Sequence, residues 1–187
     1  MCDGSSSYNR FLAGDKDAID ELIRDYIDGL IFYIYSIIGD MDLAEETATD
    51  VFIKLYADKP KFKGDSAFKT WLYKIGRNKA LNQLRRKKRI SVSETSLDDA
   101  YSVSDDENIE QNYIQQENNT LLRHTVEKLK PEYSQILCLI YFENFNNSEA
   151  GKIMKKNSKQ IRDLLYRAKN ALKRELEKEG IDYERLC

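Results

Sequence analysis

The stretch SEAGKIMKKNSKQIRDLLYRAKNAL, residues 148–172, has the pattern of two helices of unequal length separated by a short polar turn. Its apolar residues recur every three or four positions, which predicts a short helix over 148–155 and a longer one capped by Ser158. Gly151 would permit a close crossing of the two helices, and Asn157 in the turn tolerates a positive φ. The segment therefore predicts a helix-turn-helix within an all-α fold.

The longer predicted helix separates apolar from polar side chains. Its apolar face carries Ile161, Leu164, Leu165, Ala168 and Leu172. Its polar face carries Lys159, Gln160, Arg162, Asp163, Tyr166, Arg167 and Lys169. In the major groove of DNA, arginine pairs with guanine, glutamine pairs with adenine, and aspartate accepts from cytosine. The pattern favours a DNA-recognition helix, and the alternative on this segment alone is a packed helical hairpin with a polar outer face.

The preceding sequence completes a helical unit that we place at 119–178, with a short tail at 179–187. Leu121, Leu122 and Val126 stand at its head. Pro131 is expected near the first position of a new helix, where its missing N–H is no loss. Cys138 lies in an apolar run and is expected to be a core residue.

Another helical unit is predicted over residues 8–90. A 3.6-residue apolar period predicts its first helix, which runs from a cap at Asp15 to about Ile38, where Gly39 provides the stop. The predicted apolar stripe of this helix consists of Ile19, Leu22, Ile23, Tyr26, Ile27, Leu30, Ile34 and Ile38.

Two more helices follow in this unit. Asp42, with Glu45 three residues later, makes an acidic variant of the capping box and opens the second helix of the unit. The predicted apolar stripe of this second helix consists of Ala48, Val51, Phe52 and Leu55. Ser66 is expected to cap the other, which ends in a basic run near residue 88. Trp71 falls on the apolar stripe of this last helix and is expected to be a core residue.

Residues 91–118 contain eight Asp and Glu, no Lys or Arg, and few large apolar residues. Such a composition predicts an acidic flexible linker. The predicted architecture is therefore two small helical domains joined by this linker.

The charge of the chain is banded, which its formal net value of −2 conceals. Residues 59–89 contain twelve Lys and Arg against one acidic residue, and residues 152–174 contain nine against one. Residues 1–58 contain four basic and thirteen acidic side chains. Phosphate attraction needs clustered Lys and Arg, so the two basic bands favour nucleic-acid binding, and the acidic bands favour a second, basic partner. For one band alone, a solvated helix face is the alternative.

The sequence gives little support for other classes of protein. The sequence has no phosphate-binding glycine motif, zinc-protease motif or nucleophile elbow, and it contains one histidine and three widely spaced cysteines. We therefore expect no enzyme activity, no cofactor, no metal site and no small-molecule substrate. No run of 18 apolar residues predicts a membrane span, and the first ten residues lack the apolar stretch of a signal peptide. We expect a cytoplasmic protein.

Residues 62–89, FKGDSAFKTWLYKIGRNKALNQLRRKKR, resemble regions 2.3 and 2.4 of the extracytoplasmic-function (ECF) sigma factors of the sigma-70 family. Residues 42–56, DLAEETATDVFIKLY, resemble region 2.2. Residues 144–172 resemble region 4.2. The resemblance implies a transcription initiation factor with a region 2 helical bundle and a region 4 helix-turn-helix, which binds core RNA polymerase and promoter DNA.

By this resemblance, the loop at 61–66 and the helix after it would hold the non-template strand of the −10 element and help to melt it. Asn78 is expected to contact a flipped base. The other residues expected on this surface are Lys63, Ser66, Lys74, Arg77 and Arg85, and those expected to read the −35 element are Lys159, Gln160, Arg162, Asp163, Tyr166 and Arg167.

The resemblance also implies protein partners. The residues expected to bind core polymerase are Asp42, Glu45, Glu46 and Asp50. An anti-sigma factor is a further expected partner, and it could hold the protein at a membrane. Two departures from the family pattern bear on details: Thr49-Asp50 stands where Gln-Glu is frequent, and Leu164 stands where a basic residue is common.

The main alternative is a stand-alone helix-turn-helix regulator of transcription. Such proteins usually dimerise, so that two recognition helices lie one DNA turn apart. That reading leaves residues 62–89 unexplained, and an adaptor that binds only proteins leaves both basic bands without a role. We also expect the free protein to bind DNA poorly, because its two units fold against each other or onto an anti-sigma partner.

Overall fold

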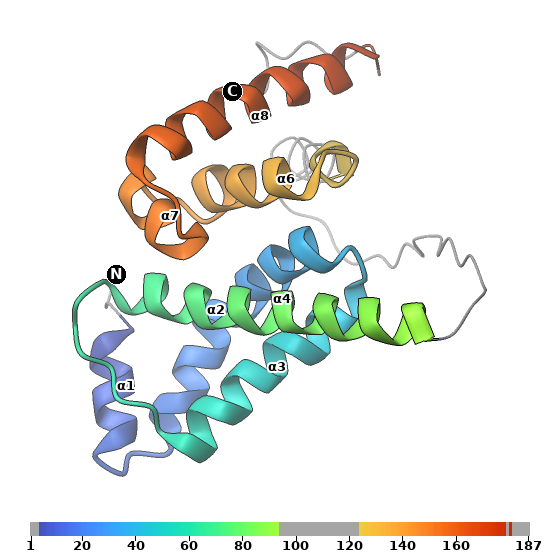
Figure 1. Ribbon diagram of the computed structural model, residues 1–187. Coiled ribbons are helices and arrows are strands. Elements are labelled where there is room, and N and C mark those ends of the chain that lie inside the picture. The colour runs from blue at the N-terminus through green and yellow to red at the C-terminus, as the bar shows by residue number, and fades with distance from the viewer. Residues whose placement is uncertain (1–3, 94–123, 179, 181–187) are drawn as a thin grey trace.

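The computed structural model describes residues 4–93, 124–178 and 180. In this part of the chain every regular element is a helix, and the helices form two units (Figure 1). The first unit contains α1 (Ser5–Leu12), α2 (Asp17–Ile38), α3 (Met41–Asp58) and α4 (Phe68–Ser93). The second unit contains α6 (Pro131–Leu137), the π-helix η1 (Cys138–Phe142), α7 (Asn147–Met154) and α8 (Ser158–Lys178). The expected all-α class is confirmed.

Helix α2 is the centre of the first unit, and α1, α3 and α4 pack against it. The residue that precedes it is Lys16 rather than the predicted Asp15, although the Asp15 carboxylate accepts a hydrogen bond from the backbone N–H of Asp17 at 3.2 Å. Gly39 ends the helix with φ 73°, as predicted, because glycine enters the left-handed region at little cost.

The buried face of α2 is wider than the predicted apolar stripe. Phe32, Tyr33 and Ile37 are buried although they lie outside that stripe. The reason is a second contact: besides the first unit, α2 packs against α6 and η1. A helix that is covered on more than one side is apolar around most of its circumference, and residues 29–38 have that composition.

Two helix starts in the first unit differ from the predicted ones. Asp40 caps α3, because its carboxylate accepts a hydrogen bond from the backbone N–H of Leu43 at 3.1 Å. The predicted cap at Asp42 is therefore wrong, and Asp42 lies in the first turn of the helix. Helix α4 begins at Phe68, two residues after Ser66, so Ser66 belongs to the preceding loop and does not occupy the cap position.

The second unit is built around α8, which packs on α6 and α7. Pro131 is the first residue of α6, as predicted. The π-helix η1 follows directly, and in it the N–H of Glu143 donates to the carbonyl of Cys138, five residues back, at 3.0 Å. Cys138 is fully buried, which confirms its predicted core position.

Asparagine residues cap both helices of the helix-turn-helix. Asn146 caps α7 with a complete capping box. Asn157 and Gln160 make the same reciprocal pair at the start of α8, since the backbone N–H of each donates to the side-chain oxygen of the other at 2.9 Å. The cap is therefore Asn157, and the prediction of Ser158 is wrong. The left-handed residue of the turn is Lys155, with φ 56°, and not Asn157.

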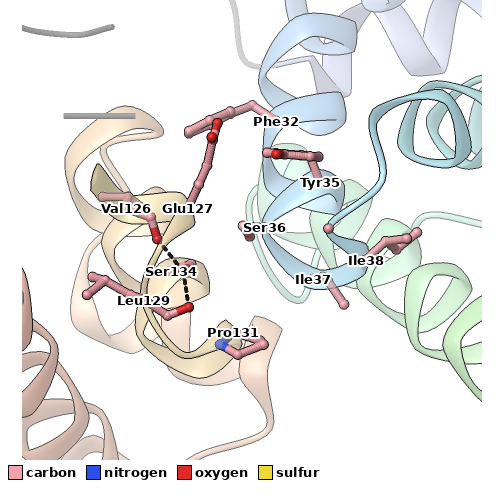
Figure 2. A pocket seen from close by; sticks show the side chains of 11 residues that line it. Phe32, Tyr35, Ser36, Ile37, Ile38, Val126, Glu127, Leu129, Pro131 and Ser134 are labelled. Carbon is pink, nitrogen blue, oxygen red and sulfur yellow. Dashed lines mark hydrogen bonds between the residues drawn. The ribbon is translucent and has the colours of Figure 1, made fainter. Parts of the chain in front are cut away.

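The two units are in contact, since α2 packs against α6 and η1, and α4 packs against α7 (Figure 1). A pocket lies at this junction, between the end of α2 and residues 126–134 (Figure 2). Helix α4 continues to Ser93, past the predicted boundary at residue 90. The rest of the predicted linker, and Leu121 and Leu122, lie outside the described residues.

Candidate nucleic-acid interface

Helix α8 presents one polar face to solvent. The six residues predicted to read the −35 element are all exposed: Lys159, Gln160, Arg162, Asp163, Tyr166 and Arg167. They recur at intervals of three or four residues, so they share a side of the helix. The opposite side is buried through Ile161, Leu164, Ala168 and Leu172, as predicted. Tyr166 has 70% of its surface exposed, which is unusual for so large an aromatic residue.

The turn before α8 is tight, and Gly151 makes it possible. A Cβ atom at this position would lie 2.8 Å from the backbone oxygen of Lys156, closer than real contacts allow. The N–H of Lys156 donates to the carbonyl of Gly151 at 3.0 Å, which fixes the approach of the turn to α7. The predicted role of Gly151 is confirmed, and it sets the direction in which α8 leaves the motif.

The cap of α8 changes what Gln160 can offer to DNA. Its side-chain oxygen already accepts the N–H of Asn157. A bidentate pair with adenine needs both the oxygen and the nitrogen of the amide. With the cap intact, Gln160 can form that pair only by accepting a second hydrogen bond on the same oxygen, whereas its amide nitrogen can donate to an acceptor directly.

The predicted −10 residues divide between a loop and α4. Lys63 is exposed on the loop before α4, and Ser66 beside it is half-buried. On α4, Lys74, Asn78 and Arg85 are exposed and share one face of the helix. The structure thus brings an exposed amide and two cations together on one surface.

Arg77 differs from the other predicted −10 residues. It is half-buried, and its Nε atom is enclosed without a hydrogen-bond partner. Its charge lies close to Tyr33, a buried residue of α2: burial raises the pKa of Tyr33, and the charge of Arg77 partly offsets that rise. Part of Arg77 is therefore withdrawn from the surface that the other predicted −10 residues form.

An aromatic cluster holds the loop that carries Lys63. Phe62, from the loop, packs on Trp71 with ring centroids 5.3 Å apart. Tyr8, from α1, packs on Trp71 at 5.5 Å, and its hydroxyl donates to the carbonyl of Pro60 at 2.6 Å. Trp71 is partly buried and packs against the core, in agreement with its predicted core position. Helix α1 therefore anchors both ends of the loop.

The predicted polymerase-binding residues lie on the outer face of α3. Asp42, Glu45 and Glu46 are exposed. Asp50 is half-buried, and its carboxylate forms an ion pair with Lys79 of α4 at 2.9 Å. Three of the four carboxylates thus face solvent directly, and the fourth also ties α3 to α4.

Two large apolar residues on the same face of α3 were not predicted. Ile53 has 59% of its surface exposed and Tyr56 has 50%. Ile53 lies two helical turns after Glu46, and Tyr56 follows Ile53 by three residues, so acid and apolar side chains form one exposed face. A signal was present in the sequence, because Ile53 and Tyr56 fall outside the apolar stripe of the predicted second helix. Exposed apolar residues that cluster in this way mark a site of protein contact more often than chance.

Comparisons with known proteins agree with this architecture. The family profile of Sigma-70 region 2 matches residues 22–90. The RNA polymerase sigma-H factor of Pseudomonas aeruginosa is 30% identical over 175 residues, which cover 90% of this chain and 91% of that protein. The chain belongs to the sigma-70 family, as an ECF sigma factor. Such proteins are transcription initiation factors. The ECF RNA polymerase sigma factor SigW of Bacillus subtilis is 26% identical over 170 residues, covering 87% of this chain and 91% of SigW.

Two solved structures share the fold of this protein. The sigma factor RpoE of Bartonella quintana, in complex with the anti-sigma factor NepR, superposes with a TM-score of 0.68 at 19% identity, over 84% of this chain and 96% of RpoE. CnrH, in complex with the cytosolic domain of CnrY, superposes with a TM-score of 0.64 at 17% identity, over 95% of this chain and 98% of CnrH. At these identities the likeness concerns the fold alone.

The described residues lack two kinds of structural feature. No helix among them is both long and apolar enough to span a membrane. Within the same residues, no three His, Cys, Asp or Glu side chains gather as a metal site would require.

Proposed function

We propose that this sigma factor directs core RNA polymerase to promoters by reading a −35 element with α8 and a −10 element with α4 and the loop before it. The observation that carries the proposal is the pair of exposed polar and basic helix faces, one on each unit. One face has the residue types of a major-groove reader, and the other combines an amide with cations beside an aromatic cluster. We further propose that the first unit, at 8–90, and the second, at 119–178, act as separate DNA-binding domains.

Helix α8 would enter the major groove with its first turns, where Lys159, Arg162 and Asp163 are exposed. Arg162 and Asp163 have the functional groups that distinguish guanine and cytosine. Arg167 donates from Nε to the backbone carbonyl of Asp163 at 3.2 Å, which directs its guanidinium along the helix. In this orientation the guanidinium of Arg167 suits a contact with a DNA phosphate, and the exposed Tyr166 is its neighbour in the sequence.

The −10 element would be read as an open single strand. A binder of this kind combines a cationic surface with a site for an unstacked base, and it gains free energy when the base leaves the duplex. Asn78 would contact the flipped base, while Lys63, Lys74 and Arg85 neutralise phosphates around it. Ser66 and the accessible part of Arg77 would complete the surface. Melting then follows from preferential binding of the open strand.

Core polymerase would bind the outer face of α3. The exposed carboxylates of Asp42, Glu45 and Glu46 offer charge to a basic surface, and Ile53 and Tyr56 offer apolar area that binding can bury. Charged rims steer association and buried apolar groups supply affinity. Asp50 would support this face through its ion pair with Lys79. An anti-sigma factor is the other proposed partner, and tethering of the protein to a membrane would depend on that partner.

The test is transcription by purified core polymerase on fragmented genomic DNA of the source organism, with and without this protein, with RNA 5′ ends mapped. The expected result is a set of new start sites that share two upstream elements. Tight, sequence-selective binding of the protein to duplex DNA, with no binding to core polymerase, would overturn the proposal in favour of a stand-alone helix-turn-helix regulator.

A further inference from the structure

The contact between the two units has a polar centre, formed by Gly29, Lys69, Tyr73 and Glu143. The hydroxyl of Tyr73 donates to the carboxylate of Glu143 at 2.5 Å. The ammonium group of Lys69 pairs with the same carboxylate at 2.9 Å and donates to the backbone carbonyl of Glu143 at 2.8 Å. Both donors belong to α4, and Glu143 follows η1 of the second unit. One residue of the second unit thus receives three polar contacts from the first.

The shape of α2 accommodates this carboxylate. A Cβ atom at Gly29 would lie 2.5 Å from Oε1 of Glu143 and 2.6 Å from the hydroxyl of Tyr73. A side chain at position 29 would therefore force the Glu143 carboxylate and the Tyr73 hydroxyl to move. Only 11% of the Glu143 side-chain surface is exposed, so its charge depends on Lys69 and Tyr73 for solvation.

Aromatic rings surround the polar centre. Phe142 packs edge-on against Phe32 of α2, with ring centroids 5.1 Å apart. Phe145 packs edge-on against Tyr73 at 5.0 Å, and the ammonium group of Lys69 lies 5.0 Å from the centroid of the Phe145 ring. Rings on both sides of a charged pair exclude water and fix its geometry. The surface on α2 and α4 thus fits a turn with the pattern Phe-Glu-x-Phe, and the chain supplies that turn itself at 142–145.

We propose that Gly29, Lys69, Tyr73 and Glu143 form an intramolecular lock, the Glu143 lock, which holds the free sigma factor closed and must open before both promoter elements can be read at once. The requirement to open follows from size. The −10 and −35 elements lie about 25 base pairs apart, or ~85 Å at ~3.4 Å per base pair. A compact chain of this length has a radius of gyration of about 16 Å and a diameter of roughly 40 Å. A closed molecule is therefore too short to span the two elements.

The contact between the two units is also weak enough to open and close reversibly. Its centre is a hydrogen-bonded ion pair, whose net stabilisation is small because both charges lose hydration. Beside it, the pocket between the end of α2 and residues 126–134 leaves part of the junction unfilled (Figure 2). Phe32 lines this pocket and also packs on Phe142, so the hollow reaches the edge of the lock. A permanent interface would be packed as densely as a protein core.

Two substitutions test the lock from opposite sides. Gly29→Ala places a methyl group where it collides with Glu143 and Tyr73, and Glu143→Gln keeps the shape of the side chain but removes the charge that pairs with Lys69. Glu132→Gln is the matched control, because Glu132 pairs with Lys156 inside the second unit at 3.5 Å and is exposed. Circular dichroism verifies that each variant keeps its helices.

Small-angle X-ray scattering of the full-length proteins provides the measurement. We expect Gly29→Ala and Glu143→Gln to increase the radius of gyration by roughly a quarter over the ~16 Å of a compact chain, and Glu132→Gln to leave it unchanged. The same radius for all four proteins would overturn the proposal, whether that radius is compact or expanded. An effect of Glu132→Gln equal to that of Glu143→Gln would also overturn it, because charge alone would then explain the change.

A second readout connects the lock to the proposed function, on which this part of the inference rests. If only the open form binds core polymerase, the wild type has a higher apparent dissociation constant than a variant that is always open. The ratio of the two constants equals the inverse of the fraction of wild-type molecules that are open. A lock that is closed in nine molecules of ten would thus give about a tenfold gain in affinity for Gly29→Ala. Expansion without any gain in affinity would overturn the coupling to polymerase. Absence of polymerase binding by every variant, together with expansion, would instead contradict the proposed function.

Discussion

Tyr8 provides a quantitative test of how α1 supports the loop before α4, which we propose to contact the −10 element. This residue is fully buried, and it joins the loop both by packing and by its hydrogen bond to the carbonyl of Pro60. Tyr8→Ala removes a ring that buries about 200 Å², and at ~25 cal/mol per Å² this burial contributes ~5 kcal/mol to the free energy of unfolding. Measured substitutions of a large buried residue by alanine lower that free energy by about 3–5 kcal/mol, which is the loss that we expect. Tyr8→Phe removes only the hydrogen bond. Because Pro60 is half-buried and water can solvate its carbonyl, we expect a loss of about 1 kcal/mol.

The assay is urea unfolding followed by tryptophan fluorescence. Trp71 is the only tryptophan of the chain and lies in the same aromatic cluster as Tyr8, so its emission reports on the first unit. Tyr56→Phe is the control, because Tyr56 belongs to the same unit but is 50% exposed, and we expect it to change the unfolding free energy by less than about 0.5 kcal/mol. A loss below about 1 kcal/mol for Tyr8→Ala would refute the argument that α1 anchors the loop.

Four further predictions concern the other surfaces. Arg162→Ala should weaken binding to the −35 element by about 1–3 kcal/mol in a titration with holoenzyme, and an equal loss on scrambled DNA would reassign the residue to phosphate. Ile53→Ser should weaken binding to core polymerase at least ~10-fold, since ~1.5 kcal/mol or more of apolar burial is lost, with thermal stability unchanged. Asn157→Ala should lower the unfolding free energy by about 1 kcal/mol and Ser158→Ala by almost nothing, because Asn157 is the cap. Burial raises the pKa of Tyr8 to about 12 against ~10 in the unfolded chain, so stability should be unaffected below pH ~10 and fall between pH ~10 and ~12, and Tyr8→Phe should reduce that fall.

The sequence predicted α2, α3, α4, α6, α7 and α8 and the exposed polar face of α8, because both depend on local periodicity, whereas α1 and η1 were not predicted. Three- and four-residue spacing placed Arg162 on the outside of α8 and Leu164 on the inside. It located the helix ends less accurately, because several neighbouring polar residues can each act as a cap. Asp40 and Asp42 both satisfy the pattern, and only the backbone geometry of the turn after Gly39 selects Asp40.

Contacts between the units were beyond the reach of sequence periodicity. Nothing in the spacing of Lys69 or Glu143 distinguishes them from solvated surface residues, since each has its partner about 70 positions away. The expectation that the two units fold against each other came from the charge pattern, whereas the residues that hold them together required the structure. The apolar composition around Phe32 was the one sequence signal for a second buried face of α2.

The π-helix η1 suggests how such a contact can arise or disappear by a single insertion or deletion. A π-helical turn holds one residue more than an α-helical turn, and such turns are common at functional sites. Deleting one residue between Cys138 and Phe142 would restore α-helical hydrogen bonding and rotate the following chain by about 100°. Glu143 would then turn away from Lys69 while α6, α7 and α8 kept their own sequences. Two sigma factors that differ by this one codon would thus differ in how tightly they close, although both would keep every residue that we propose to contact DNA.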